Sequence, residues 1–199
     1  MLAALLVVGI SGCTPSDDGS TAQSSVPTLP TVPFTPTTPK TSTTPATADY
    51  QRLLLSAADL SDAEDTFTER SKESQPNGTA GASAFFVNDQ DSRAISDTFL
   101  IYPDAATATA TLKQAAGTLP TLVAGGTPKP LAVGTDGVVV SGAYPEEDKA
   151  VTLVFFTEGR SLVRLEFQSA TGDSTTDQFV NNVAKMQQIA LRSGLSDAQ

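Results

Sequence analysis

The second half of the chain contains two apolar runs whose spacing predicts a β-hairpin. The runs are Val151–Thr157 and Leu162–Ser169, and Glu158-Gly159 between them forms a two-residue turn in which glycine supplies the positive φ. Apolar and polar residues alternate in the second run, which indicates a strand with one buried and one solvated face. Its apolar positions are Val163, Leu165 and Phe167, and its polar positions are Arg164, Glu166 and Gln168.

Further short stretches predict the remaining strands. They are rich in apolar, aromatic and β-branched residues, which favour strands, and glycines or clusters of polar residues separate them. A polar cluster at 88–92, for example, predicts the turn between two of them. We expect these strands at Phe67–Arg70, Gly81–Asn88, Arg93–Tyr102, Leu131–Val133 and Gly137–Ser141.

Three segments have the signals of helices. Tyr50–Ser56 predicts a short helix at the start of the domain, and a second helix opens at Asp104 and ends at Gly117. A long third helix follows Ser174, which together with Asp177 resembles a capping box. This helix has an apolar stripe and is expected to end at a glycine. The stripe consists of Phe179, Val183, Met186 and Ala190, with Val180 and Ile189 beside it, and the glycine is Gly194.

The order of these elements predicts an α+β fold for residues 50–199. We expect a single domain with a largely antiparallel sheet of about six to seven strands and two to three helices packed on one face. About 150 residues are enough for one sizeable core. We find no internal repeat and no second domain.

The first residues of the chain predict export and lipid anchoring. Residues 2–10 are apolar apart from one glycine, too few to span a bilayer as a helix but the length of a signal-peptide core. Ile10-Ser11-Gly12-Cys13 follows and resembles the lipobox of bacterial lipoproteins. The resemblance implies a signal peptide at 1–12, cleavage between Gly12 and Cys13, and diacylglycerol on the Cys13 sulfur. The alternative is a buried N-terminal strand with a free core cysteine.

Residues 13–49 predict a disordered tether after the lipidated cysteine. From residue 14 to 49 the chain has seven prolines and eleven threonines, and too few apolar side chains to offset the entropy of ordering the backbone. An extended stalk of this length reaches on the order of 100 Å, at about 3.1 Å per residue. O-glycosylation of the stalk is compatible with its composition.

The composition excludes several classes of activity. The 199 residues include no histidine and a single cysteine, so neither a Ser-His-Asp triad, nor a Cys-His pair, nor an imidazole or thiolate zinc site can form. The formal net charge of −10 disfavours binding to nucleic acid. We therefore expect a protein that is not an enzyme and that carries no cofactor and no metal.

Four groups of polar residues are candidates for chemistry. Two acidic clusters could serve glycoside hydrolysis or Ca²⁺ binding, but their spacing matches no EF-hand loop and they are interpreted as solvated loops. The glycine-rich loop before Lys129 lacks the spacing of a phosphate-binding motif and is interpreted as a simple loop. Arg164 and Glu166 either line a ligand groove or are ordinary charges on an exposed strand. The clusters are Asp59, Asp62, Glu64 and Asp65, and Glu146, Glu147 and Asp148; the loop is Gly125-Gly126-Thr127-Pro128-Lys129.

The whole plan resembles the cell-envelope lipoproteins of mycobacteria and related actinobacteria. Within the domain, a weaker resemblance links the chain to the extracellular sensor domain of mycobacterial membrane Ser/Thr kinases and to related lipoproteins. The residues that carry it are Leu53-Leu54-Leu55 with Asp59-Leu60, Ile101-Tyr102-Pro103-Asp104-Ala105-Ala106, and Asp177 to Leu191. This resemblance implies a sheet-and-helix domain with a ligand-binding cleft. The relatives carry paired cysteines that this domain lacks, so no site residues are transferred.

These observations predict a lipoprotein on the extracytoplasmic face of the cell membrane. Membrane lipid attached through Cys13 is the expected partner, and the domain is expected to bind an envelope ligand or protein whose binding residues the sequence does not identify. One alternative is a carrier of lipid or glycolipid, which requires a large apolar cavity. A second is a carboxylate-dependent cell-wall hydrolase that uses Glu146 and Glu147.

Overall fold

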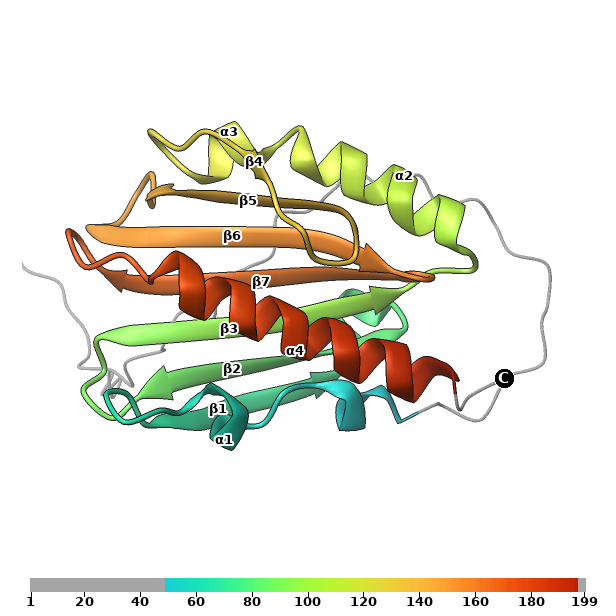
Figure 1. Cartoon of the computed structure of the whole chain (residues 1–199), viewed down its shortest axis with the longest axis horizontal. Helices are drawn as coiled ribbons and strands as arrows, with labels where there is room; N and C mark the ends of the chain where they lie inside the picture. Colours follow the sequence, from blue (N-terminus) through green and yellow to red (C-terminus); the bar gives the residue numbers. More distant parts are fainter. Residues whose placement is uncertain (1–48, 197–199) are drawn as a thin grey trace, which may run out of the picture. The chain divides into compact units, whose positions relative to one another are not determined.

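The predicted hairpin lies at the centre of a seven-stranded antiparallel sheet. In the computed structural model, which describes residues 49–196, the hairpin is formed by β6 (Lys149–Glu158) and β7 (Ser161–Ala170). Its turn is Gly159-Arg160, one residue later than predicted, and Gly159 has the expected positive φ, 56°. The strand order is β1-β2-β3-β7-β6-β5-β4 (Figure 1). The predicted α+β class and the number of strands are confirmed.

The other strands agree with the sequence pattern except near one edge. Leu131–Val133 was expected to be a strand, but the ladder contains the two preceding residues instead, and Leu131 and Val133 are buried side chains of the core. Their apolar character therefore reflects burial and not strand pairing. The remaining strands are β1 (Phe67–Ser74), β2 (Gly81–Asn88), β3 (Arg93–Ile101), β4 (Lys129–Pro130) and β5 (Thr135–Ala143).

Two long helices and several single turns pack on the sheet. The long ones are α2 (Ala105–Ala116) and α4 (Asp177–Ser196). No helix in the described residues is both long and apolar enough to cross a membrane. The single turns are η1 (Tyr50–Leu53), α1 (Ala57–Leu60), η2 (Pro76–Gly78) and α3 (Leu119–Leu122).

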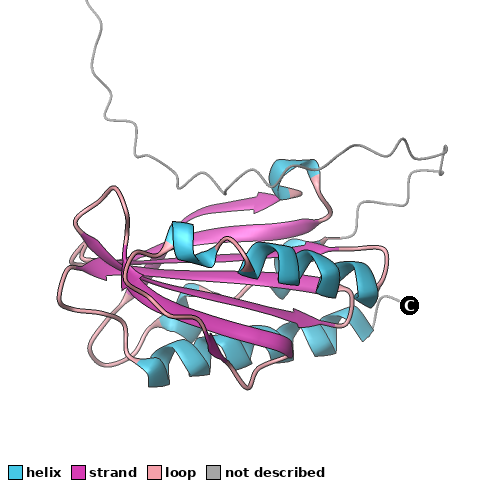
Figure 2. Cartoon of the chain, turned by 90° about the horizontal axis from the view of Figure 1, so that it is seen from above, coloured by secondary structure: helices cyan, strands magenta, loops and turns pink. Residues whose placement is uncertain are grey.

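The helices cover both faces of the sheet and not one face as expected. In β6, Val154 and Phe156 belong to the core beneath α4, whereas Leu153 and Phe155 belong to a second core that includes residues of α2 and α3. Successive side chains of a strand point to opposite faces, so the two cores lie on opposite sides of the sheet. Figure 1 shows α4 in front of the sheet and α2 towards its β5 end, and Figure 2 shows how the twisted strands fan out.

The helix ends show which local signals were interpreted correctly. Asp104 caps α2 as predicted, because its Oδ1 accepts a hydrogen bond from Thr107 N at 2.7 Å, and α2 ends at Gly117. The predicted capping box at Ser174 is wrong: the hydroxyl of Thr176 accepts the hydrogen bond from N–H of the first turn of α4. The expected stop at Gly194 is also wrong, because α4 continues to Ser196.

Gly194 has a packing role inside α4. A Cβ at this position would collide with the side chain of Leu53, and the backbone oxygen of Gly194 accepts a hydrogen bond from Arg52 Nη2 at 3.0 Å. Helix α4 and residues 50–55, which we call the N-terminal segment, therefore approach so closely here that only glycine fits.

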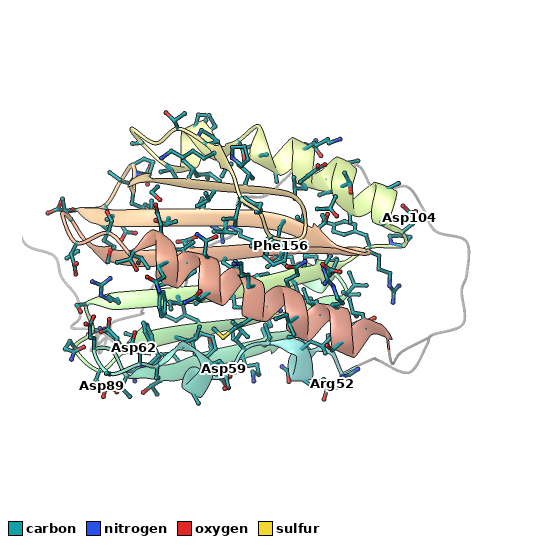
Figure 3. The ribbon with its side chains drawn as sticks, viewed as in Figure 1. Arg52, Asp59, Asp62, Asp89, Asp104 and Phe156 are labelled. Atoms are coloured by element: carbon teal, nitrogen blue, oxygen red, sulfur yellow. The ribbon has the colours of Figure 1, made fainter. Side chains whose placement is uncertain are left out.

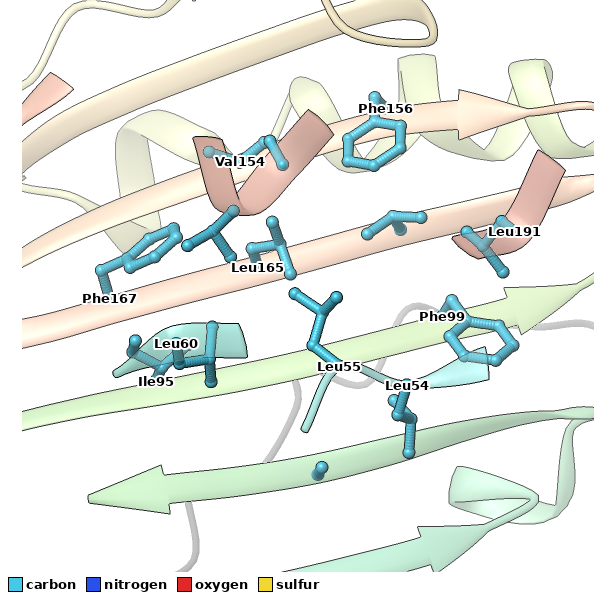
Figure 4. Close-up of a cluster of buried hydrophobic side chains, with 14 of the residues drawn as sticks. Leu54, Leu55, Leu60, Ile95, Phe99, Val154, Phe156, Leu165, Phe167 and Leu191 are labelled. Carbon is cyan, nitrogen blue, oxygen red and sulfur yellow. The ribbon is translucent and has the colours of Figure 1, made fainter. Parts of the chain in front are cut away.

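Two buried polar side chains hold this N-terminal segment in the core. Leu53, Leu54 and Leu55 are buried in the core that residues of α4 and of the sheet also form, and Figure 4 shows Leu54 and Leu55 among its side chains. Gln187 of α4 donates a hydrogen bond from Nε2 to Leu53 O at 3.1 Å. Asp97 of β3 accepts one at Oδ2 from Leu55 N at 3.3 Å. Both side chains are fully buried.

We predict that Asp97 makes the domain less stable as the pH rises. Burial raises the pKa of this carboxyl to about 7, against the smaller opposing effects of the Leu55 hydrogen bond and the Lys72 charge. Between about pH 4 and pH 7 the folded state then binds one more proton than the unfolded state, so the free energy of unfolding falls as the pH increases. At about 1.4 kcal/mol per pKa unit, the loss is on the order of 4 kcal/mol.

Urea denaturation at several pH values measures this effect. Asp97→Asn removes the titrating group but keeps an oxygen for Leu55 N, so the decline between pH 4 and pH 7 should be absent in this variant. Asp89→Asn is the matched control, because Asp89 is exposed, and it should retain the wild-type pH dependence. If the free energy of unfolding falls equally steeply with pH in the wild type and in Asp97→Asn, Asp97 is not the cause of the pH dependence.

Candidate functional site

A cleft lies between the start of α4 and the β4 edge of the sheet. Its volume is about 490 Å³, compared with about 90 Å³ for a second hollow between the start of β1 and α4. Small-molecule sites typically have volumes of about 300–1,000 Å³. The larger cleft is lined by Gly125, Thr127, Lys129, Pro130, Leu131, Ala132, Val139, Ser141, Asp177, Val180 and Asn181.

The first turn and a half of α4 forms one side of the cleft. Asp177, Val180 and Asn181 are spaced three and four residues apart, so they lie on the same face of the helix. Val180 is buried and anchors this face to the core, while Asp177 is exposed. Asn181 donates a hydrogen bond from Nδ2 to Asp177 O at 2.8 Å, which fixes the position of its amide.

The other side is formed by residues 123–133, which we call the β4 segment. Two hydrogen bonds between Ala124 and Ala143, at 2.9 and 3.0 Å, attach it to β5. A Cβ on Gly126 would lie 2.6 Å from the Val140 side chain, and one on Gly142 would collide with Ala124 O. The glycine-rich sequence is therefore a loop, as predicted, and its Gly126 allows close packing against β5.

The floor of the cleft combines apolar and hydroxyl groups of β5. Val139 packs against the core beneath α4, and Ser141 lies two residues further along the same face of the strand. The hydroxyl of Thr152 on β6 donates to Ser141 Oγ at 2.9 Å, so the Ser141 proton is available to a molecule in the cleft. The site can thus offer both hydrogen bonds and apolar contact.

Arg164 and Glu166 form a buried ion pair, which neither sequence interpretation anticipated. Only 13% of the Arg164 side chain and 1% of the Glu166 side chain are exposed, so these residues are not ordinary surface charges. Glu166 also accepts a hydrogen bond from Gln168 Nε2 at 2.6 Å. Neither charged residue lines either of the two hollows. The groove hypothesis therefore gains no support, and the pair is part of the interior.

The carboxylates of the first acidic cluster are occupied by local structure. Asp59 accepts hydrogen bonds from the N–H and hydroxyl of Ser56, which lower its pKa and form a capping box at α1. Asp62 accepts bonds from the backbone of Glu64 and Asp65, which lower its pKa. Within residues 49–196, no group of three carboxylate, histidine or cysteine side chains could hold a metal ion.

Arg93 connects the first acidic cluster to the loop before α4. Its Nε lies 3.1 Å from Asp65 Oδ2, and its Nη2 lies 2.6 Å from Asp173 Oδ2. Figure 3 shows Asp62 and Asp89 at this end of the domain and Asp104 at the opposite end. The cluster thus lies in a loop, as predicted, and in addition stabilises the junction of two loops, which the interpretation as a solvated loop did not include.

The second acidic cluster lies in the exposed turn between β5 and β6. Glu147 pairs with Lys149 at 2.6 Å, and Asp148 Oδ1 accepts a hydrogen bond from the hydroxyl of Thr171 at 2.7 Å. None of its three carboxylates lines either hollow. Neither of these two hollows therefore provides a site for hydrolysis at Glu146 and Glu147.

The predicted lipidation site lies outside the described residues. Gly12 and Cys13, with the signal peptide at 1–12 and the tether at 13–49, remain predictions from the sequence. The sequence did not identify the cleft, because its lining combines residues between 125 and 141 with the start of α4, which is far from them in the chain. The only signal was the glycine-rich loop, which contributes Gly125, Thr127 and Lys129.

The comparisons with known proteins identify a shared fold. No family model matches the chain, and no curated protein is significantly similar to it. Among solved structures, it is similar to the extracellular domain of PknH from Mycobacterium tuberculosis, with a TM-score of 0.50 and 13% sequence identity. The match covers 73% of this chain and 96% of the PknH domain. The weaker of the two resemblances is thereby supported at the level of the fold.

We predict that breaking the Arg164–Glu166 pair destabilises the domain. Arg164→Met removes the guanidinium and leaves the buried Glu166 carboxylate without its positive partner, which costs about 3–5 kcal/mol in the free energy of unfolding. Urea denaturation at neutral pH measures the loss.

The double variant Arg164→Met/Glu166→Gln is the matched control. Its neutral amide can still accept from Gln168 and leaves no buried charge, so it should recover more than half of the lost stability. If the double variant is as unstable as Arg164→Met, lost packing of the Arg164 stem is the cause, and the electrostatic explanation is wrong.

Proposed function

We propose that this chain is a lipid-anchored cell-envelope protein whose folded domain binds a small ligand and has no catalytic activity. The anchor is the diacylglyceryl group on Cys13, and residues 13–49 hold the domain away from the membrane surface. The domain acts as a binding or sensor module on the extracytoplasmic face. The cleft between α4 and the β4 segment is its ligand site.

The cleft is the observation on which the binding function depends. Its volume of about 490 Å³ suits a small molecule, and its lining contains charged, amide, hydroxyl and apolar groups. In contrast, the carboxylates Asp59, Asp62 and Asp65 are engaged in hydrogen bonds or ion pairs of their own loops. The larger cleft combines its volume with the polar side chains of Lys129, Ser141, Asp177 and Asn181.

The location rests on the N-terminal sequence together with the shared fold. The apolar run at 2–10 and the lipobox-like Ile10-Ser11-Gly12-Cys13 favour export and anchoring. The PknH domain that shares the fold is an extracellular domain. Two or more acyl chains, such as palmitate, anchor a protein stably without a basic patch, which is consistent with the net charge of −10.

The lipid-carrier alternative has less support. The core beneath α4 is filled by side chains such as Phe99, Phe156 and Phe167, each at most 1% exposed. The cleft has polar residues on both sides, which does not suit acyl chains. A binding module for a small polar ligand therefore fits the described residues better than a carrier.

We predict that Cys13→Ala releases the protein from membranes. Without the thiol, the diacylglyceryl group cannot be attached, and the net charge of −10 gives the chain no overall electrostatic attraction to an anionic lipid surface. The measurement is the distribution of the full chain between membrane and soluble fractions of the expressing bacterium. Ser16→Ala is the matched control and should remain in the membrane fraction; membrane association of Cys13→Ala would refute the anchor.

We predict that the cleft retains a small molecule when the protein is purified from its host. Native mass spectrometry of the full chain should show a bound mass in the wild type. Ser141→Phe, which places a ring on the floor of the cleft, should lose this mass, whereas Ser141→Ala, which also removes the acceptor of the Thr152 hydroxyl but adds no ring, should retain it. An unliganded wild type, or a mass retained in Ser141→Phe, would contradict this site.

A further inference from the structure

We propose that the ligand of the cleft is a short zwitterionic peptide. Its carboxylate binds Lys129 of β4, and its ammonium group binds Asp177 of α4. This inference rests on the proposed function, since it assigns a chemical class to the ligand of the same cleft.

The two charges in the cleft have opposite sign and belong to different elements. Lys129 lies on β4 and Asp177 on the first turn of α4, and both line the cleft. Among the residues that the structure describes, neither side chain forms an ion pair or accepts or donates a side-chain hydrogen bond. A ligand that carries one charge of each sign at its two ends complements both groups.

The neutral groups of the cleft suit peptide bonds. The Oδ1 of Asn181 has no hydrogen-bond donor among the described residues, because only its Nδ2 is engaged, so it can accept from a peptide N–H. Ser141 can donate its hydroxyl proton to a peptide carbonyl. Between these groups, Leu131, Val139 and Val180 provide apolar contact for small side chains.

The lining argues against a sugar and against a simple anion. It contains no aromatic side chain, so the cleft lacks a flat apolar surface on which a sugar ring could stack. The net charge of −10 repels anions at long range, and a carboxylate within the cleft repels them at short range. A zwitterion has no net charge and avoids both repulsions.

NMR titration of the full chain with trialanine tests the inference. We expect trialanine to shift the backbone signals of Lys129, Val139 and Val180 at millimolar concentration. N-acetyl-trialanine lacks the ammonium group and trialanine amide lacks the carboxylate, so each should bind up to about fivefold more weakly, which corresponds to about 1 kcal/mol for one exposed ion pair.

Two variants assign each end of the peptide to its residue. In Lys129→Met, trialanine and its amide should bind equally, because the group that recognises the carboxylate is absent. In Asp177→Asn, trialanine and its N-acetyl form should bind equally. Lys185→Met and Asp89→Asn are the matched controls, since both residues are exposed and outside the cleft, and they should preserve the wild-type preferences.

The outcomes separate this inference from the proposed function. N-acetylglucosamine and inorganic phosphate are titrated in parallel. If either shifts the cleft signals while trialanine does not, the zwitterion inference is overturned and the cleft remains a ligand site. Equal binding of trialanine and its capped forms to the wild type also overturns it. If none of the probes shifts the cleft signals, both the inference and the binding function fail.

Discussion

Burial of β6 on both of its faces determines the arrangement of the domain. Val154 and Phe156 point towards α4, and Leu153 and Phe155 point towards α2, and all four are at most 5% exposed. Each such side chain contributes about 1.5–3 kcal/mol when it is buried. A strand that is apolar on both sides cannot leave either face of its sheet in water. The sheet therefore needs two covering layers, which α4 and α2 provide.

The two layers are completed in different ways. Helix α2 buries Ala108 and Leu112 and lies on β5, β6 and β7, so its small side chains let it approach the sheet closely. Helix α4 covers the other face together with the N-terminal segment. That segment has no strand partner, yet Leu53 O and Leu55 N are in the interior, where an unpaired peptide group is costly. Gln187 and Asp97 are buried because they supply these partners.

The sequence predicted the elements better than it predicted how they assemble. Period-two alternation in β7 and the cap at Asp104 are local signals, and the hairpin and α2 were correctly placed because nothing distant overrides them. Gly194 was misread as a helix stop because its role depends on Leu53, which is 141 positions earlier in the chain. Close approach of two distant segments leaves no local pattern.

Charged residues on strands show the same limit. Arg164 and Glu166 alternate with apolar residues, as charges on a solvated strand face do, but they are buried as a pair. The sequence also assigned all helices to one face, although β6 carries apolar residues at consecutive positions, which indicates burial on both faces. This signal was present in the sequence, whereas the burial of Arg164 and Glu166 depends on the layer that covers their face of the sheet.

The position of the cleft follows from where the covering layers end. The β4 segment adds only two residues to the ladder before it turns into the core, and α4 begins at Asp177 beside it. A hollow at this edge costs little stability, because the filled core lies beneath the middle of α4. Exposed ion pairs contribute only about 0–1 kcal/mol, so folding does not require Lys129 and Asp177 to be paired. Both charges are therefore available to a ligand without loss to the fold.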